Sequence, residues 1–209
     1  MQTFQIIRRE PGNALAVPLI PDLPLLISGS GKTTLLKLIC GLYSIDKGGI
    51  YLNNVLIDKE DIGNLRRHTA YAPFDPILIT GTFIDQVLFG NKQLSLNEVI
   101  YYATIAGVAE FVDSNQGYQR IIERGGSNLS SGQKQRLMLS TALAKQSDVI
   151  VIDEAMTNLD LEIKTYILDQ IQLLSSDKVV IIVSHDPFVL VRCNKVYLLD
   201  KGEMIGCGH

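Results

Sequence analysis

The chain has 209 residues, with 19 Lys and Arg against 22 Asp and Glu, so its formal net charge is −3. Hydrophobic residues make up 46% and charged residues 20%, an ordinary globular composition that excludes wholesale disorder. This length allows a substantial core, and we expect one domain over residues 1–209. The slightly acidic balance gives no general electrostatic attraction for nucleic acid, so no nucleic-acid partner is expected.

The sequence predicts neither a membrane span nor a disulfide framework. A spanning helix needs about 20 consecutive apolar residues, and the apolar runs here, such as Val179–Val183, are much shorter. The first residues lack the apolar region of a secretory signal. Cys40, Cys193 and Cys207 are widely spaced and form no C-x-x-C pair, which indicates reduced thiols.

The first part of the chain is β-rich. Thr3–Arg8 and Ala14–Ile20 are predicted strands, separated by a Pro-Gly turn and expected to form a small antiparallel lobe. Pro18 favours an edge position for the second strand because proline cannot donate to a ladder. A short strand at Leu25–Ile27 leads into a glycine-rich loop, and a helix is expected from Thr33 to about Leu42.

The rest of the chain has the pattern of a parallel sheet combined with helices. Three apolar, β-branched runs predict buried strands at Thr69–Ala72, Val149–Ile152 and Val179–Val183. A helical subdomain is expected over roughly residues 81–145, with its clearest helices at Leu96–Ala106 and Ser131–Lys145. The remaining predicted elements are a short helix near Pro187–Arg192 and strands at Lys195–Leu199 and Glu203–Ile205.

The glycine-rich loop is the first motif that carries chemistry. It consists of Ser28, Gly29, Ser30, Gly31, Lys32, Thr33 and Thr34. Backbone N–H groups of such a loop and the following helix N-terminus form an anion site, where glycine lets the backbone approach phosphate. Lys32 is expected on the β and γ phosphates of a nucleotide, and the Thr33 hydroxyl on Mg²⁺. The full pattern has glycine at position 26, where this chain has Leu26; a loop shortened by two residues is the alternative.

Two carboxylates follow the apolar run Val149–Ile152. Open α/β sheets bind ligands at the carboxyl ends of their strands, which is where Asp153 and Glu154 are expected. Asp153 fits a direct or water-mediated role at Mg²⁺. Glu154 fits a general base that polarises an attacking water. The alternative is that the pair only begins a solvated turn.

The segment Leu129-Ser130-Ser131-Gly132-Gln133 opens one of the predicted helices. Ser130 is a favourable N-cap, and Gly132 lets the backbone come close to a ligand. If this segment stood alone, a simple helix cap would be the preferred interpretation.

His185 follows the apolar run Val179–Val183, at the same predicted sheet edge. A neutral imidazole there can contact a γ-phosphate and the attacking water. A hydrogen-bonded surface histidine is the alternative, and it is the preferred interpretation for His68 and His209.

In chain order, these motifs resemble the nucleotide-binding domain of ATP-binding cassette (ABC) transporters. The glycine-rich loop resembles Walker A, Leu129–Gln133 resembles the family's LSGGQ signature, and Val149–Glu154 resembles the Walker B strand with its catalytic glutamate. Ala155–Asp160 is similar to the D-loop, with Asp160 as its acidic residue, and His185 to the switch histidine. The resemblance covers nearly the whole chain, and LSGGQ separates this family from other P-loop ATPases.

Two further stretches resemble the exporter branch of the family. Residues 64–90 are similar to the exporter pattern around the Q-loop, and Glu123–Gly126 resembles the exporter x-loop. Two positions depart from the family pattern. Phe74 stands where the Q-loop has glutamine, and a phenyl ring can neither ligate Mg²⁺ nor hydrogen-bond water. Ser131 replaces a glycine of the signature.

The resemblance implies an α/β fold: a P-loop NTPase core with a mostly parallel sheet, an N-terminal antiparallel β-lobe and a helical subdomain. It implies ATP and Mg²⁺ as cofactors, Glu154 and His185 as catalytic residues, and Thr33 and Asp153 as the metal site. It also implies a head-to-tail dimer in which Walker A and B of one protomer face LSGGQ of the other. The implied nucleotide contacts are Ser28, Gly29, Ser30, Gly31, Lys32, Thr33, Thr34, Ser130, Gly132, Gln133 and Asp160.

The same resemblance implies a transmembrane domain as partner, either on the same longer chain or as a separate subunit. It also implies that the chain lies at the cytoplasmic face of a membrane, as part of a transporter. ATP hydrolysis would energise export. Two alternatives stay open: a low-turnover regulatory or binding-only cassette, which Phe74 and Leu26 favour, and a soluble ABC ATPase without a transport role.

Overall fold

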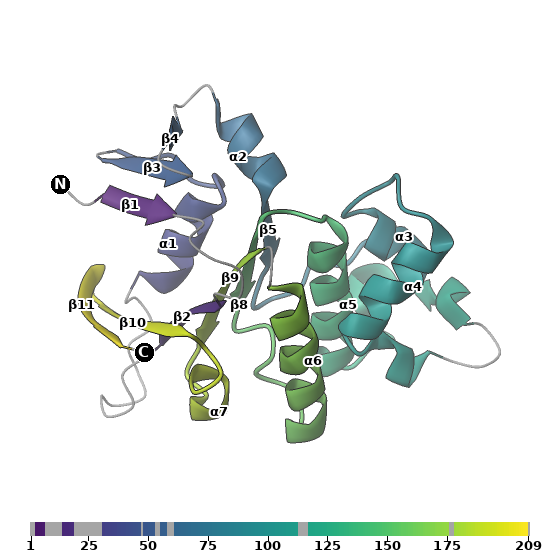
Figure 1. The fold of residues 1–209 in the computed structure, drawn as a ribbon. Coiled ribbons are helices and arrows are strands. Elements are labelled where there is room, and N and C mark those ends of the chain that lie inside the picture. The colour runs from purple at the N-terminus through teal and green to yellow at the C-terminus, as the bar shows by residue number, and fades with distance from the viewer. Residues whose placement is uncertain are drawn as a thin grey trace. The chain divides into compact units, whose positions relative to one another are not determined.

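The computed structural model describes residues 3–6, 14–18, 31–46, 48–52, 55–57, 61–112, 117–175 and 178–208 (Figure 1). The chain forms two compact units. The first comprises Met1–Tyr71, Ser147–Asp153 and Leu174–His209, and the second Ala72–Gln146 and Glu154–Leu173. None of the helices within the described ranges is both long enough and apolar enough to cross a membrane.

A six-stranded sheet forms the centre of the first unit, with the strand order β11-β10-β2-β9-β8-β5. The strands are β2 (Ala14–Pro18), β5 (Thr69–Ala72), β8 (Val149–Asp153), β9 (Val179–Ser184), β10 (Lys195–Asp200) and β11 (Glu203–Gly208). Parallel ladders join β10 to β2, β2 to β9 and β9 to β8, whereas β10 and β11 are antiparallel. The mostly parallel sheet that the sequence predicts is therefore confirmed.

Helix α1 (Lys32–Ile39) packs on this sheet through apolar side chains. Leu36 and Ile39 lie in one cluster with alternate residues of β8 and β9, because side chains two positions apart share a face of a strand. The members from the strands are Val149, Val151, Ile181 and Val183. Burying one such side chain contributes about 1.5–3 kcal/mol, so this contact fixes the start of α1 against the sheet.

The first two strands do not pair with each other, so the antiparallel pairing expected between them is wrong. The strand β1 (Thr3–Ile6) runs parallel to β3 (Gly49–Leu52), which pairs antiparallel with β4 (Val55–Ile57) in a separate three-stranded sheet. The strand β2 is interior rather than at an edge. Pro18 is tolerated because it is the last residue of β2, beyond the stretch that pairs with β10. The strand expected at Leu25–Ile27 lies outside the described residues.

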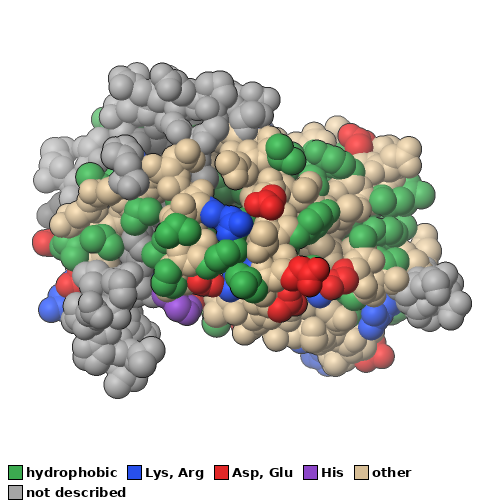
Figure 2. Space-filling view, turned by 60° about the horizontal axis from the view of Figure 1, so that its bottom comes forward, with side chains coloured by type: hydrophobic (Ala, Val, Ile, Leu, Met, Phe, Trp, Pro, Cys, Tyr) green, Lys and Arg blue, Asp and Glu red, His purple; other side chains and the backbone are tan. Residues whose placement is uncertain are grey.

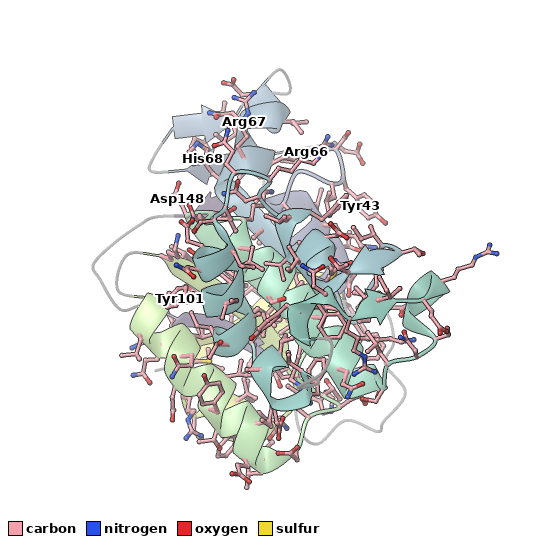
Figure 3. All side chains as sticks on the ribbon, turned by 90° about the vertical axis from the view of Figure 1, so that its right-hand side faces the viewer. Tyr43, Arg66, Arg67, His68, Tyr101 and Asp148 are labelled. Atoms are coloured by element: carbon pink, nitrogen blue, oxygen red, sulfur yellow. The ribbon has the colours of Figure 1, made fainter. Side chains whose placement is uncertain are left out.

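Polar contacts join the end of helix α2 (Ile62–His68) to the residues before β8. His68 Nδ1 and Asp148 Oδ2 are 2.6 Å apart, and their side chains point toward each other (Figure 3). The Ser147 hydroxyl donates to the Arg67 carbonyl at 3.3 Å. Helix α7 (Pro187–Leu190) follows β9 and is capped by Asp186, whose Oδ1 accepts from the Phe188 N–H.

Helices dominate the second unit. They are α3 (Phe83–Leu88), α4 (Leu96–Ile105), α5 (Ser131–Ala144) and α6 (Leu161–Leu174). The short strands β6 (Gly81–Thr82) and β7 (Ile121–Ile122) pair antiparallel, and single 3₁₀ turns lie at Val108–Phe111, Gly117–Gln119 and Arg124–Gly126. Residues 81–145 fall inside this unit, which also contains α6, a helix that the sequence analysis did not predict.

Large apolar side chains are exposed at several positions of the second unit. They include Phe74, Ile77, Phe89, Leu96, Tyr101, Ile121, Leu161 and Leu173. On the face drawn in Figure 2, hydrophobic side chains lie in separate groups among charged and polar ones. The Phe74 ring is 52% exposed, so it is not a core residue.

A buried polar network links α3 to α5. The side chains of Gln86 and Thr141 are at most 3% exposed. Gln86 Nε2 donates to Thr141 Oγ1 at 3.1 Å, and Gln86 Oε1 accepts from the Ile79 N–H at 2.8 Å. The Thr141 hydroxyl in turn lies 3.0 Å from the Leu137 carbonyl. Every polar group of the pair thus has a partner inside the unit.

Replacing Thr141 by valine should destabilise the protein, because the Gln86 amide then stays buried without its acceptor. We expect the free energy of unfolding to fall by about 1–3 kcal/mol. Urea unfolding followed by circular dichroism measures it. The control is Thr165→Val, since the Thr165 hydroxyl donates only along its own helix, to the Leu161 carbonyl. Equal losses in both variants would contradict a role for the network.

Candidate nucleotide site

Gly31 begins the described part of the glycine-rich loop and is the N-cap of α1. Its φ of 87° lies in the left-handed region, which glycine adopts without strain. A Cβ on Gly31 would lie 3.3 Å from the Cα of Gly202, so there is little room for a side chain. Lys32 is the first residue of the helix, followed by the exposed Thr33 and Thr34. The remaining loop residues predicted to bind nucleotide, Ser28, Gly29 and Ser30, lie outside the described residues.

The start of α1 suits an anion. Its first turn has N–H groups without partners inside the helix, and no acidic side chain lies in that turn. The helix dipole adds partial positive charge at the same point, and the Lys32 side chain extends from it. The described part of the loop therefore fits a phosphate group.

Two predicted site residues lie at the carboxyl ends of neighbouring parallel strands. Asp153 is the last residue of β8 and is 3% exposed; it stands opposite Val183 of β9 in the register. His185 comes two residues after Val183 and is exposed. The sheet thus brings a buried carboxylate and an imidazole to one edge, the edge at which open α/β sheets bind ligands.

A tyrosine that the sequence analysis did not single out contacts the buried carboxylate. The hydroxyl of Tyr71, on β5, donates to Asp153 Oδ2 at 2.8 Å. Burial of the ring and the bond to Asp153 raise the pKa of Tyr71 well above its usual range, so the phenol stays protonated and acts as the donor. No sequence motif signals this contact; the only hint is that Tyr71 occupies the predicted strand that leads to Phe74.

Glu154 has a strained backbone. Its φ of 51° lies in the left-handed region, which is uncommon for a residue other than glycine and costs about 1–3 kcal/mol. The backbone N–H and the hydroxyl of Thr157 both donate to the Glu154 carbonyl, at 3.1 and 2.8 Å. This turn redirects the chain directly after the strand β8, at the residue predicted to be the general base.

The signature segment forms the N-terminus of α5 through a reciprocal cap. Ser130 Oγ accepts from the Gln133 N–H at 3.2 Å, and Gln133 Oε1 accepts from the Ser130 N–H at 3.0 Å. The N-cap predicted at Ser130 is thereby confirmed. Since both side chains take part in the cap, the groups that the segment offers an anion are chiefly the N–H groups of the first turn.

Gly132 packs against the D-loop segment, residues 155–160. A Cβ on Gly132 would lie 3.1 Å from the Asn158 carbonyl oxygen and 3.3 Å from a methyl group of Leu159. The buried Gln135 side chain accepts from the Asn158 N–H at 3.3 Å. Close packing within this unit is thus a second reason for glycine at position 132, besides the approach to a ligand inferred from the sequence.

Asp160 caps the helix that follows the D-loop. Its Oδ1 accepts from the Ile163 N–H at 3.0 Å, at the start of α6. Within the second unit, the structure therefore joins the signature segment, the D-loop and α6 through Gly132, Gln135 and Asp160. The sequence analysis missed Gln135, whose only signal is a polar residue among the apolar positions of a predicted helix.

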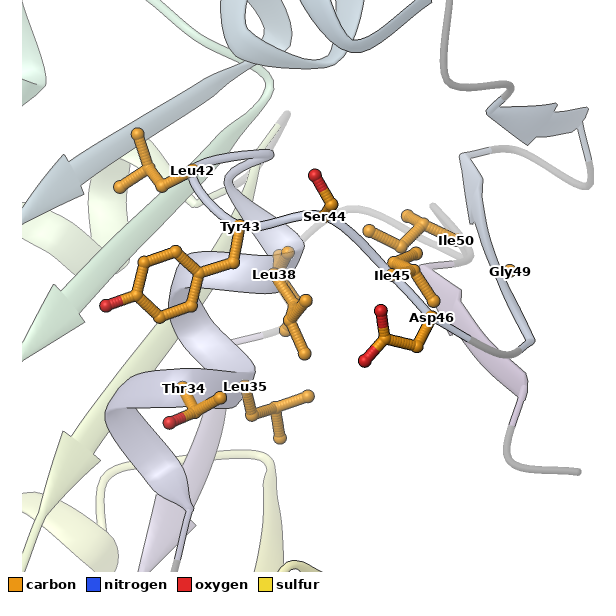
Figure 4. Close-up of a pocket in the computed structure, with 11 residues that line it drawn as sticks. Thr34, Leu35, Leu38, Leu42, Tyr43, Ser44, Ile45, Asp46, Gly49 and Ile50 are labelled. Carbon is orange, nitrogen blue, oxygen red and sulfur yellow. The ribbon is translucent and has the colours of Figure 1, made fainter.

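A pocket of about 690 Å³ lies along α1 in the first unit (Figure 4). Leu35 and Leu38 form its wall on the helix side, and Thr34 lies at its lower end in the view of Figure 4. Among the described residues that line it, Asp46 is the charged one, and the others are mostly apolar. This lining offers a phosphate no described cationic side chain, whereas the α1 N-terminus offers N–H groups and Lys32.

The residues at the sheet edge fit a magnesium nucleotide. Within the described ranges, no three His, Cys, Asp or Glu side chains gather as a metal cage. Mg²⁺ usually takes one or two carboxylates and completes its shell with substrate phosphates and water. A single buried carboxylate at Asp153, together with the Thr33 hydroxyl at the start of α1, is a donor set of this kind.

Comparisons with known proteins identify the family of the chain. The family model described as "ABC transporter" matches residues 27–157, more than half of the chain. The lactococcin-G-processing and transport ATP-binding protein LagD of Lactococcus lactis is 34% identical over 87% of this chain and 26% of its own length. The alpha-hemolysin translocation ATP-binding protein HlyB of Escherichia coli is 30% identical over 87% of this chain and 26% of its own length.

The fold matches a solved structure of the same kind. A bacterial Atm1-family ABC exporter with ATP bound superposes with a TM-score of 0.86 and 26% sequence identity, over 95% of this chain and 34% of that chain. The chain spans about a quarter of the length of the curated relatives it matches. The chain belongs to the ABC transporter family, and within it the chain is similar to the ATP-binding part of exporters.

Proposed function

We propose that this chain binds ATP with Mg²⁺ and hydrolyses it, and that hydrolysis energises export through a transmembrane domain. The observation that carries the proposal is the buried Asp153 at the end of β8, with His185 directly after the neighbouring strand β9 and the strained Glu154 directly after Asp153. A carboxylate kept from water is stabilised by hydrogen bonds and by a cation. The Tyr71 hydroxyl donates one hydrogen bond to Asp153, and the Mg²⁺ of a magnesium nucleotide would supply the cation.

Each residue has a role that its position supports. The N–H groups at the start of α1 and the Lys32 ammonium hold the β and γ phosphates. Thr33 and Asp153 hold Mg²⁺, which neutralises phosphate charge when bound. Glu154 accepts a proton from the attacking water, and His185 contacts the γ-phosphate.

The second half of the site comes from another copy of the chain. The α5 N-terminus carries the partial positive charge of a helix dipole, and its first turn has no acidic residue. We infer that it binds the γ-phosphate of ATP held by a partner, in a head-to-tail dimer. The packing of Gly132 and Gln135 against the D-loop supports this role, because it holds both segments in one arrangement.

The names of the relatives support the assignment to export. LagD is named for lactococcin G processing and transport, HlyB for alpha-hemolysin translocation, and ComA of Streptococcus pneumoniae, 34% identical over 86% of this chain and 25% of its own length, for transport and processing. We propose an analogous place for this chain, on the cytoplasmic face of a membrane beside a transmembrane domain.

A low-turnover regulatory cassette is the second candidate. Phe74 favours it, because a half-exposed phenyl ring stands where the family has a glutamine that can bind metal or water. Glu154 and His185 oppose it, since both residues needed for turnover are present.

Glu154→Gln should stop turnover and leave binding intact. The amide keeps the shape and loses the base, so we expect phosphate release to fall at least about 100-fold. Affinity for a fluorescent ATP analogue should stay at the wild-type value. Glutamine has the same size as glutamate and must adopt the same left-handed backbone conformation, so the melting temperature should not change.

The matched control for Glu154→Gln is Glu203→Gln, an exposed glutamate on β11 that should have no effect. The variant should also show a dimer by light scattering in MgATP, because unhydrolysed nucleotide holds two copies together. Phosphate release at the wild-type rate would show that Glu154 is not the base.

Phe74→Gln tests whether the missing glutamine limits turnover. An added oxygen ligand near Mg²⁺ should raise the rate of phosphate release at saturating MgATP. Because the ring is half exposed, the free energy of unfolding should change by less than about 0.5 kcal/mol.

Phe89→Gln is the control for Phe74→Gln, since its ring is 64% exposed and lies outside the Q-loop segment. An unchanged or lower rate for Phe74→Gln would contradict the idea that position 74 limits hydrolysis.

A further inference from the structure

Tyr71 joins β5 to the predicted nucleotide edge of the sheet by a side-chain hydrogen bond. It lies one residue before the end of β5, and β5 is the neighbour of β8 in the strand order. Its hydroxyl donates to Asp153 Oδ2 at 2.8 Å, across 82 positions of sequence. Both residues belong to the first unit, so the contact is internal to one compact body.

This hydrogen bond fixes the orientation of the Asp153 carboxylate. A phenol that donates to an ionised carboxylate makes a charge-assisted bond, which is stronger and more directional than a bond between neutral groups. Asp153 is 3% exposed, so little water competes for the same oxygen. The bond from Tyr71 to Oδ2 therefore restricts the rotation of the carboxylate, which would present it to Mg²⁺ in one orientation.

The position of Tyr71 along the chain also supports a role in the nucleotide site. Phe74 follows three residues later, in the place of the Q-loop glutamine, and offers no polar atom. The Tyr71 side chain hydrogen-bonds the predicted site residue Asp153. The Tyr71 hydroxyl therefore gives β5 a polar contact with the predicted nucleotide edge.

We propose that Tyr71 is a positioning residue of the nucleotide site, which orients the Asp153 carboxylate toward magnesium-bound nucleotide. The proposal rests on the proposed function. It differs from a purely structural role in one measurable respect: loss of the hydroxyl should weaken nucleotide binding only when Mg²⁺ is present.

The test is Tyr71→Phe, which removes the hydroxyl and keeps the ring. Affinity for a fluorescent ATP analogue is measured in Mg²⁺ and in EDTA. Because partners of metal ligands typically change metal affinity by about 10–100-fold and Asp153 is one ligand among several, we expect affinity in Mg²⁺ to fall about three- to tenfold. Affinity in EDTA should stay at the wild-type value. The free Mg²⁺ that half-saturates phosphate release should rise by a similar factor.

Tyr166→Phe is the matched control. The Tyr166 hydroxyl also donates a hydrogen bond, at 3.1 Å, but to the main-chain carbonyl of Thr104. The control should leave both affinities and the Mg²⁺ dependence unchanged. If Tyr71→Phe loses equal affinity in Mg²⁺ and EDTA, or binds as the wild type does in both, the positioning role is overturned.

A double-mutant cycle with Asp153→Asn tests whether Tyr71 acts through Asp153. If it does, Tyr71→Phe should have no further effect on Mg²⁺-dependent affinity once Asp153 is changed. Additive effects would overturn the proposal. The wild-type protein distinguishes failure of the proposed function from failure of the inference about Tyr71. If the wild type binds the analogue no more tightly in Mg²⁺ than in EDTA, the proposed function is overturned. If the wild type binds more tightly in Mg²⁺ and Tyr71→Phe binds equally well, only the inference about Tyr71 is overturned.

Discussion

Asp153 is held almost entirely out of water at the carboxyl end of β8, and the arrangement of the first unit depends on how that charge is accommodated. An isolated buried carboxylate is strongly unfavourable, so its surroundings must supply hydrogen bonds or a cation. The Tyr71 hydroxyl supplies one hydrogen bond from β5. The apolar cluster of α1, β8 and β9 supplies rigidity, because it fixes the strand end against the helix that begins at the phosphate loop. In the proposed function, the Mg²⁺ of a bound nucleotide would supply the cation at this edge.

In the second unit, the main constraint is close packing between the start of α5 and the D-loop segment. A Cβ on Gly132 would crowd the Asn158 carbonyl oxygen at 3.1 Å, and the Gln135 side chain accepts from the N–H of the same residue. Ser130 and Gln133 cap each other at the start of α5. Close packing at Gly132 and the hydrogen bond from Asn158 to the Gln135 side chain therefore hold the start of α5 against the D-loop segment.

Features that depend on short sequence patterns could be predicted. The strand β8 and the helix α5 follow from apolar runs and a cap, and Asp153 follows from its place after the run. Pairing between distant segments could not be predicted. The partner of β1 is β3, far along the chain, and the interior position of β2 is tolerated only because Pro18 ends the strand. The Tyr71 contact with Asp153 is non-local in the same way.

Helix α6 is a different case, because its local signals are present. Asp160 caps it, and Ile163, Ile167, Leu168 and Ile171 recur at the spacing of a buried helical face. The left-handed backbone of Glu154 has no such signal, since glutamate rarely adopts it and only the turn made by Thr157 requires it.

The proposed function requires that hydrolysis takes place at a site shared by two copies of this chain. The most direct measurement is the rate of phosphate release per chain at saturating MgATP, over a wide range of protein concentrations. The account predicts that the rate per chain rises with concentration and then levels off as dimers form. A rate per chain that stays constant down to the lowest concentration, with the protein monomeric by light scattering, would contradict it.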